Sequence, residues 1–388
     1  MPAALDKLAA AVQADWPLWL TRLQALVQCE SATEDAAGVN RAMDMVAAWA
    51  PGARVVRHAQ AGYGDVMEVW FDRAQQAQPR MLLGHLDTVW PAGTLAQMPW
   101  REAPDAQGRE RLWGPGVLDM KCGVVMAMAA IDAVQRSGGL PRTVVLLLNP
   151  DEEMGSPVSR AHTERIARLC DAVYVVEPAQ GLPGSHDNAA YKTARKGVGL
   201  YRLDVTGVAA HSGVDFERGH SAVLQLAALL QQVAAFTDAA TGFTVNPGVI
   251  GGGTRSNVVA AHAWAEVDVR IARAADADRA DALFHALRVT DPACSLQVTG
   301  GINRPPMERG DGTVRLFQQA RALAAQLGIT LDEAATGGGS DGNFTAGLGI
   351  PTLDGMGAVG EGAHAAHESV LLSELVTRVT LLAAMIAS

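Results

Sequence analysis

A histidine and an aspartate stand two residues apart directly after a short apolar run. His85 and Asp87 follow Met81-Leu82-Leu83, which has the composition of a buried strand. At a strand end, residues two apart point to the same face, so the carboxylate of Asp87 can orient the imidazole of His85. A histidine held in this way is a common metal ligand. The alternative is an exposed histidine beside a solvated carboxylate, and the pair alone does not decide between them.

Four more carboxylates lie near predicted strand ends or in a glycine-rich loop. Asp119 occupies a glycine-rich segment that leads into a helix, where capping of that helix is the competing role. Glu152 and Glu153 follow the most apolar strand of the chain. Adjacent carboxylates at a buried strand end repel each other, which favours a nearby cation over a solvated acidic turn. Glu177 ends a further strand before a proline, and by itself it would be a turn residue.

Two histidines near the C-terminus add further possible ligands. His364 and His367 are three residues apart after glycine-rich sequence, which predicts a loop opening into a helix. Exposed loop histidines are the alternative. Taken together, imidazole and carboxylate groups without thiolates favour zinc in a catalytic setting, with manganese or cobalt as alternatives. A set of five ligands exceeds the four of a structural zinc, so we predict two metal ions about 3.5–4 Å apart.

Strands and helices alternate in the segments that must position these groups. Apolar residues recur at helical spacing in residues 1–50, and a helix is predicted at Gly123–Arg136. Short apolar runs predict strands at Val66–Phe71, Met81–Leu83, Val144–Leu148 and Val173–Val176. This order predicts an α/β catalytic domain with a mostly parallel, helix-covered sheet. In such sheets, sites form beyond the carboxyl ends of the strands.

From about Lys196 the pattern changes to period-two alternation. Leu200–Thr206 and Ala263–Ile271 alternate in this way, which predicts antiparallel strands with one exposed face. The helices predicted in the rest of the chain lie at His220–Phe236, Ala277–Leu287, 312–327 and 372–387. A chain of 388 residues predicts two domains, because single cores rarely exceed about 250–300 residues. We therefore predict a smaller α+β domain at 196–305, inserted into a catalytic domain formed by 1–195 and 306–388.

Composition excludes several classes of partner. The net charge is −10, from 31 basic and 41 acidic residues, which argues against nucleic acid as a partner. No apolar run approaches the roughly 18 residues of a membrane span, and no signal peptide is visible, although a removed leader would leave the same N-terminus. The four cysteines form no CxxC pair and indicate a reduced, cytoplasmic protein. They are Cys29, Cys122, Cys170 and Cys294.

The chain resembles the dinuclear-zinc metallopeptidases that include glutamate carboxypeptidase, acetylornithine deacetylase and succinyl-diaminopimelate desuccinylase. The motifs follow the family's order over nearly the whole chain, and they are Gly84–Val89, Gly114–Lys121, Asp151–Gly155, Val176–Pro178, Ala210–Gly213, Asn257 to Arg270, Gly337–Asp341 and Gly362–Glu368. The glutamate carboxypeptidase branch is closest, on His211-Ser-Gly-Val, Arg304-Pro-Pro and the spacing from His364 to Glu368.

This resemblance implies two zinc ions per subunit. The implied ligands are His85 and Glu177 on one ion, Glu153 and His364 on the other, and Asp119 bridging both. It further implies that Asp87 orients His85, that Glu152 is the general acid/base, and that the peptide bond from Asp119 to Met120 is cis.

The same resemblance implies that the insert is a lid and dimerisation domain, so we expect a homodimer. The implied substrate contacts are His211, Asn257, Arg270 and Arg304. The guanidinium fork of Arg270 suits a substrate carboxylate, with a salt bridge to Glu266 or Asp268 as its alternative role. A structural role is the alternative for Arg304. We expect His211 to act in the active site of the other subunit of the dimer.

The expected reaction is hydrolysis of an amide bond in a small peptide or N-acyl amino acid, releasing a C-terminal amino acid. The alternative is an N-acyl amino acid deacylase of the acetylornithine or succinyl-diaminopimelate type, which uses the same chemistry on other recognised groups. A third hypothesis is a catalytically inactive metal-binding protein on the same scaffold. The presence of Glu152 beside a full ligand set argues against it.

Overall fold

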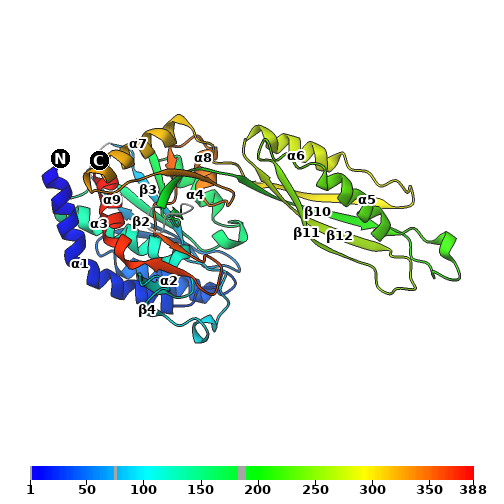
Figure 1. The fold of residues 1–388 in the computed structure, drawn as a ribbon, viewed down its shortest axis with the longest axis horizontal. Helices are drawn as coiled ribbons and strands as arrows, with labels where there is room; N and C mark the ends of the chain where they lie inside the picture. The colour runs from blue at the N-terminus through cyan, green and yellow to red at the C-terminus, as the bar shows by residue number, and fades with distance from the viewer. Residues whose placement is uncertain (1, 74–76, 182–188) are drawn as a thin grey trace. The chain divides into compact units, whose positions relative to one another are not determined.

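The chain divides into two compact units, each with its own apolar core. The structure is a computed structural model that describes residues 2–73, 77–181 and 189–388. The first unit comprises Met1–Ala194, Arg309–Thr336 and Ser340–Ser388, and the second comprises Arg195–Glu308 with Gly337–Gly339 (Figure 1).

A six-stranded sheet forms the centre of the first unit, in the order β1-β2-β6-β3-β7-β15. Its strands are β1 (Arg54–His58), β2 (Val66–Phe71), β3 (Arg80–His85), β6 (Val144–Asn149), β7 (Ala172–Val175) and β15 (Thr352–Leu353). β3 runs parallel to β6 and β7, and β15 runs parallel to β7, whereas β1 and β2 are antiparallel additions. The mostly parallel sheet expected from the sequence is therefore confirmed.

Both faces of this sheet are covered, which explains why its strands are apolar throughout. Leu146 of β6 enters one core and its neighbour Leu147 enters another, because successive side chains of a strand point to opposite faces. The first core also contains residues of α1 (Pro2–Gln28), α2 (Ala36–Ala48), α3 (Cys122–Ser137), α7 (Asp311–Gln326) and α9 (Leu372–Ala387). The second core contains residues of α4 (Arg160–Ala167), and α8 (Gly342–Gly347) precedes its partly buried Leu348 and Ile350.

Two small sheets complete the first unit. One has the order β16-β17-β5-β4, formed by β4 (Arg101–Pro104), β5 (Glu110–Trp113), β16 (Gly360–Glu361) and β17 (Ser369–Leu371). The other has the order β14-β9-β8, formed by β8 (Gln180–Gly181), β9 (Ala189–Arg195) and β14 (Glu333–Thr336). The described residues also contain four short helical turns, η1 (Thr94–Ala96), η2 (Val117–Lys121), η3 (Glu152–Met154) and η4 (Phe216–Arg218).

The second unit is a four-stranded antiparallel sheet in the order β11-β12-β10-β13, with two helices. Its elements are β10 (Gly197–Thr206), β11 (Thr244–Gly252), β12 (His262–Ile271), β13 (Ser295–Arg304), α5 (Ala222–Ala234) and α6 (Ala275–His285). Burial alternates along β12, as the period-two pattern predicts. Its buried face packs with Leu226 of α5 and Phe284 of α6. The α+β character expected for this segment is confirmed.

One local expectation is wrong. The segment after Gly362 does not open into a helix around His364 and His367, but turns and continues as β17. Gly362 and His364 have φ angles of 81° and 62°, which a right-handed helix excludes. The pairing of β17 with β5 then sets the chain direction.

All four cysteines are free. Among the residues described, none of the helices has the length and apolarity that a membrane span requires.

Candidate metal centre

Three neighbouring parallel strands end at the same edge of the sheet and bring the candidate ligands together. β3 ends at His85, which lies opposite Asn149 at the end of β6. Glu152 and Glu153 follow in η3, and Glu177 lies two residues beyond the end of β7. Because the strands are parallel and in register, their carboxyl ends meet, and the site forms there.

His85 is oriented by its neighbour, as the spacing suggests. Its Nδ1 lies 3.0 Å from the carbonyl oxygen of Asp87 and 3.3 Å from the Asp87 Oδ1. Carbonyl and carboxylate oxygens accept hydrogen bonds, so Nδ1 carries a proton and Nε2 is the nitrogen that faces the site. This Nε2 lies 3.3 Å from Asp119 Oδ1 and 3.6 Å from Glu177 Oε1. Burial would lower the pKa of His85, but the carboxylates of Asp119, Asp87 and Glu177 outweigh it and raise the pKa well above its usual value.

Asp119 lies between two imidazoles. Its Oδ1 faces His85, and its Oδ2 lies 3.3 Å from the Nε2 of His364. Burial would raise its pKa, but the two imidazoles lower it. The peptide bond from Asp119 to Met120 is cis. Asp119 does not cap the helix that follows, since α3 begins after Lys121 and has no side-chain cap. A carboxylate that presents one oxygen to each of two histidines is arranged to bridge two cations.

The second histidine meets a second carboxylate. His364 Nε2 lies 3.3 Å from Glu153 Oε2 as well as from Asp119. Asp119 and Glu153 raise the pKa of His364 to about 10. Burial raises the pKa of Glu153 despite the nearby imidazole. The five residues expected as ligands therefore lie in one cluster.

Among the described residues, three groups of possible ligand atoms occur in which all atoms lie within 4.8 Å of one another. Two belong to this cluster, one formed by His85, Asp119 and Glu153 and the other by His85, Glu152 and Glu177. The third, formed by His58, Glu68 and His162, shares no residue with it. Glu152, expected as the acid/base, thus lies as close to His85 as a ligand would. Proximity alone does not separate its role from that of Glu153.

The chemistry of this cluster fits divalent cations. The Nε2 of His85 and the Oε1 of Glu153 are buried, and within the described residues neither has a hydrogen-bond partner. Buried polar atoms rarely lack a hydrogen-bond partner unless a bound group contacts them. The carboxylates gathered around the two imidazoles also outnumber them, so the cluster needs added positive charge. Imidazole nitrogen and carboxylate oxygen are ligands that zinc, cobalt and manganese accept.

Asp87 has a second task that sequence reasoning missed. Its Oδ1 and Oδ2 accept hydrogen bonds of 3.2 Å from the backbone N–H groups of Glu152 and Glu153. Its Oδ2 also accepts a 2.8 Å hydrogen bond from the hydroxyl of Thr33. Asp87 is fully buried. It therefore positions both the histidine of β3 and the carboxylate pair that follows β6.

Asp341 supports the same turn from the other side. Its carboxylate accepts a 2.6 Å hydrogen bond from Asn149 and another from the hydroxyl of Ser156. These two residues flank Glu152 and Glu153 in the chain. Asp341 belongs to the Gly-Gly-Gly-Ser-Asp motif, which the sequence singled out without a role. The motif was the signal in the sequence that could have pointed to Asp341. Its hydrogen-bond partners, Asn149 and Ser156, are identified only by the tertiary structure.

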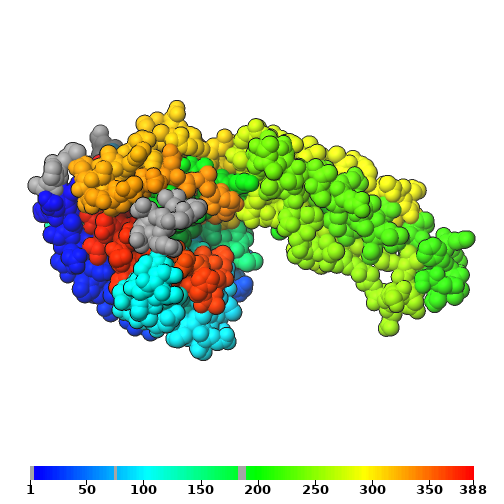
Figure 2. All heavy atoms as spheres, viewed as in Figure 1, coloured from blue at the N-terminus to red at the C-terminus, as the bar shows by residue number. Residues whose placement is uncertain are grey.

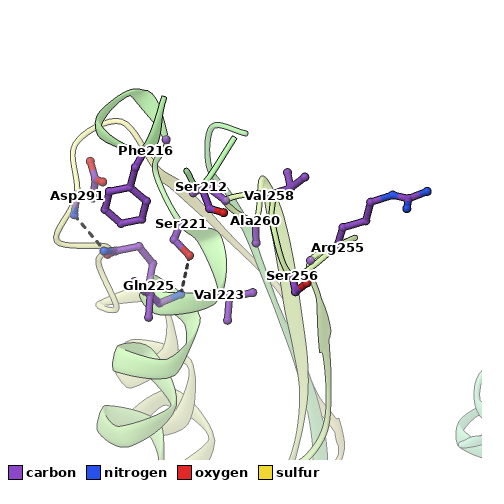
Figure 3. Close-up of a pocket in the computed structure, with 14 residues that line it drawn as sticks. Ser212, Phe216, Ser221, Val223, Gln225, Arg255, Ser256, Val258, Ala260 and Asp291 are labelled. Carbon is purple, nitrogen blue, oxygen red and sulfur yellow. Dashed lines mark hydrogen bonds between the residues drawn. The ribbon is translucent and has the colours of Figure 1, made fainter. Parts of the chain in front are cut away.

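In the second unit, two of the expected substrate residues lie together. His211 forms an isolated bridge with Val258, and Asn257 accepts a 3.0 Å hydrogen bond from the backbone of Ser212. A pocket of about 510 Å³ adjoins this pair, lined by Ser212, Ser256 and Val258 among others (Figure 3).

Arg270 lies at the opposite end of the same sheet. His262 begins β12 beside the loop of Asn257, and Arg270 stands eight residues further along that strand. At about 3.3 Å per residue, this corresponds to roughly 26 Å. Arg270 forms a bidentate ion pair with Asp268, at 2.8 and 2.9 Å, and donates to the carbonyl of Gly337 at 3.4 Å. Arg304 is buried at the end of β13. The sheet of the second unit therefore does not place the four expected substrate residues close to one another.

The chain is similar to known proteins over most of its length. The model of Peptidase family M20/M25/M40 matches residues 81–388. Carboxypeptidase G2 from Pseudomonas sp. (strain RS-16) is 30% identical over 356 residues, covering 90% of this chain and 83% of that protein. Succinyl-diaminopimelate desuccinylase from Stenotrophomonas maltophilia (strain R551-3) is 29% identical over 342 residues, covering 82% of this chain and 88% of that protein.

The fold is also found among solved structures. Aminopeptidase PepT from Bacillus cereus ATCC 10987 superposes with a TM-score of 0.74 at 22% identity, covering 95% of this chain and 97% of that one. The family match extends over most of the chain and includes every residue of the candidate metal centre. The chain belongs to the peptidase family M20/M25/M40, a family of metallopeptidases.

Proposed function

We propose that this metallopeptidase is a carboxypeptidase that hydrolyses an amide bond and releases a C-terminal amino acid, in the manner of a glutamate carboxypeptidase. The substrate would be a small peptide or an N-acyl amino acid. The observation that carries the proposal is the carboxylate of Asp119, held between His85 and His364, with Glu152 close to His85. The 30% identity to carboxypeptidase G2 supports the choice of reaction.

The cluster would hold two divalent ions, with zinc as the first choice. The ligands would be His85 and Glu177 for one ion, Glu153 and His364 for the other, and Asp119 for both. When bound, such ions polarise an amide carbonyl and make water more acidic near neutral pH.

Glu152 would move the proton. Its carboxylate would take a proton from the attacking water and deliver it to the nitrogen of the departing amino acid. The backbone of Glu152 is held by Asp87 at 3.2 Å, which fixes the start of its side chain. One proton thus passes from water to the leaving amine as the C–N bond breaks, and the second product is a carboxylic acid.

Arg270 would recognise the free carboxylate of the substrate. Its guanidinium already holds a carboxylate in bidentate fashion, that of Asp268, and the substrate would offer the same chemistry. Asn257 and His211 would contribute further contacts, with His211 donating to the oxyanion that develops on the carbonyl. Arg304, buried at the end of β13, would fix the segment through which the chain leaves the second unit.

We further propose that the first unit is the catalytic domain and that the second is a lid that pairs with a second copy. The chain enters and leaves the second unit at the Arg270 end of the sheet, where Val198 pairs with both Arg270 and Arg304. His211 lies near the other end. A separation of roughly 26 Å along the strand is too long for one small substrate to contact both residues in one subunit. This favours the contribution of His211 to the site of a second subunit.

A surface suited to that second copy lies on β11 and α5. β11 is an edge strand, with one side unpaired in the sheet. Val249 and Ile250 on β11 and Leu224 on α5 are 49%, 63% and 68% exposed. An apolar hollow of about 320 Å³ separates the two elements. Figure 2 shows this part of the second unit in green and yellow-green. A two-fold partner would cover both the apolar surface and the open edge.

A deacylase is the second candidate, because a succinyl-diaminopimelate desuccinylase is 29% identical over most of the chain. A hydrolysis panel with zinc, cobalt or manganese separates the two. N-acylated and dipeptide substrates that end in different amino acids would be compared with acylated ornithine and succinylated diaminopimelate. Fastest turnover of a substrate ending in glutamate supports the carboxypeptidase, whereas a preference for the acylated diamino acids supports the deacylase. Absence of any amide hydrolysis by the metal-loaded protein would reject both.

A further inference from the structure

Glu368 is a buried carboxylate that accepts four hydrogen bonds. Its Oε1 accepts from the backbone N–H groups of Leu118 and Asp119, at 2.8 and 3.0 Å. Its Oε2 accepts from the backbone N–H of Gly116 and from the indole of Trp90, both at 2.8 Å. The residue is 1% exposed. With two donors on each oxygen, this carboxylate is occupied by the protein and is not arranged as a metal ligand.

These donors belong to segments that carry candidate metal ligands. Trp90 follows the segment of His85 and Asp87, and the three backbone donors lie in the loop that ends at Asp119. Glu368 itself lies four residues after His364. One carboxylate therefore connects three ligand-bearing segments that are far apart in the sequence.

The main chain reinforces the same connection. The carbonyl of Glu368 accepts from the N–H of Gly114 at 3.4 Å, and its own N–H donates to Ala365 at 2.9 Å. The next residue, Ser369, pairs with Trp113 between β17 and β5. Glu368 therefore contacts the Gly114–Asp119 loop at both of its ends, through its main chain at Gly114 and through its side chain at Asp119.

The loop that carries Asp119 depends on this carboxylate for its hydrogen bonds. Asp119 has φ and ψ of −115° and 97°, so the chain is not helical there. Buried backbone N–H groups need acceptors, and Glu368 supplies them for three residues of this loop. Gly116 has φ of 69°, and a Cβ at this position would lie 2.6 Å from Thr88 Cγ2. Glycine therefore lets the loop approach closely enough for the carboxylate to reach all three donors.

We propose that Glu368 is a positioning residue of the metal centre, which sets where the bridging carboxylate of Asp119 stands relative to His364. This inference rests on the proposed dinuclear site. Residues that orient metal ligands typically contribute about 10–100-fold to metal affinity. A glutamine at this position would place an NH₂ group against N–H donors, so Glu368→Gln loses acceptor capacity while keeping the side-chain volume.

Glu68 offers a matched control. It is also a buried carboxylate, 3% exposed, and it also accepts an indole N–H, from Trp70 at 2.7 Å. Its other partners are His58 and Arg165. These residues share none of the candidate ligands of the metal centre, although His58, Glu68 and His162 form a separate group that could hold a metal ion. Glu68→Gln therefore removes a comparable buried carboxylate from the first unit without touching the loops of the centre.

The experiment measures zinc affinity of the full-length metal-free protein by competition with a chromophoric chelator, together with thermal unfolding and the absorption spectrum of the cobalt-loaded protein. We expect Glu368→Gln to weaken zinc binding about 10–100-fold and to alter the cobalt spectrum. We expect Glu68→Gln to lower thermal stability while the centre of His85 and His364 keeps its wild-type zinc affinity and cobalt spectrum. Wild-type affinity in Glu368→Gln, or an equal loss in Glu68→Gln, would overturn the proposal.

Trp90→Phe covers the case in which Glu368→Gln does not fold. This variant removes one donor and leaves three, so a smaller loss of zinc affinity is expected, and unchanged affinity would count against the proposal. A wild-type protein that binds no divalent metal would overturn the proposed function and this inference together. Retained binding in the wild type with no effect of either variant would overturn this inference alone.

Discussion

The carboxylate of Asp87 accepts a 3.2 Å hydrogen bond from the backbone N–H of Glu152. The aspartate that orients His85 therefore also sets the position of the proposed acid/base. A single fully buried side chain couples the geometry of the proposed ligand on β3 to that of the proposed proton-transfer group after β6. Through this side chain, His85 and Glu152 are held in one arrangement although 66 residues lie between them in the sequence.

Substitution of Glu152 tests which of the two carboxylates after β6 transfers protons and which binds metal. Glu152→Gln should lower turnover about 10²–10⁴-fold while both metal ions stay bound, because it removes the proton shuttle and keeps a polar side chain. Metal content of the purified variant and its hydrolysis rate are the measurements. Glu153→Gln is the matched comparison and should lose metal. A variant of Glu152 that loses a metal ion would mean that the two roles are reversed.

Metal affinity should rise with pH. Asp119 and Glu153 raise the pKa of His364 to about 10, above its ordinary value near 6.5, so the metal-free site holds a proton there across neutral pH. A cation must displace this proton, and binding becomes easier as pH increases toward 10. Calorimetric titrations at pH 7 and pH 9, in buffers of different ionisation enthalpy, measure affinity and proton release. An affinity independent of pH, without proton release, would contradict this account.

The raised pKa of His364 also predicts how the stability of the metal-free protein changes with pH. Because the folded pKa exceeds the unfolded one, the contribution of His364 to stability is complete below about pH 6.5 and is lost as pH rises through about 10. Denaturant unfolding of the metal-free protein across this range should show a decline that His364→Asn reduces. An identical decline in the variant would assign the effect to other groups.

Arg270→Ala should selectively impair substrates that carry a free α-carboxylate. Loss of one partner from a buried charge pair costs about 2–5 kcal/mol, and an amidated substrate has no such partner to lose. The ratio of kcat/KM for carboxylate and amide forms, in the wild type and the variant, measures this selectivity. Because Arg270 pairs with Asp268 in the free protein, Asp268→Asn serves as the control for disruption of that ion pair. Equal losses for both substrate forms would make Arg270 structural.

His211 should act in the site of the other subunit. Two inactive variants, His211→Ala and Glu152→Ala, would be mixed under conditions that exchange subunits. In a mixed two-fold dimer one site carries both substitutions and the other carries neither, so random mixing should restore about a quarter of wild-type sites. Subunit exchange is confirmed independently by mass spectrometry of labelled protein. No recovery after confirmed exchange would mean that His211 serves its own subunit.

Local sequence patterns were sufficient to predict the strands that carry the site. The unbroken apolar run of β6 marks a strand covered on both faces, and alternation along β12 marks one with a single buried face. These periodicities arise directly from side-chain direction, so they are readable without the fold. They also place His85 and the pair after Asp151 at strand ends, where a shared site was the natural expectation.

Contacts between loops depended on the tertiary structure. The spacing of His364 and His367 suggested a helix, but left-handed angles at Gly362 and His364 produce a turn instead. An irregular loop has no periodic pattern of residues from which its backbone conformation could be predicted.

The sequence by itself therefore determined which groups are available at the strand ends and that they suit a metal. Only the tertiary structure decided that Asp119 faces His85 with one oxygen and His364 with the other, and that the carboxylate of Glu368 collects donors from two other loops. It also separated Arg270 from the His211 end of its sheet. The physical reason is that these relationships join residues distant in the chain through irregular backbone. Their hydrogen bonds are satisfied by particular side chains, and no repeating pattern along the sequence records them.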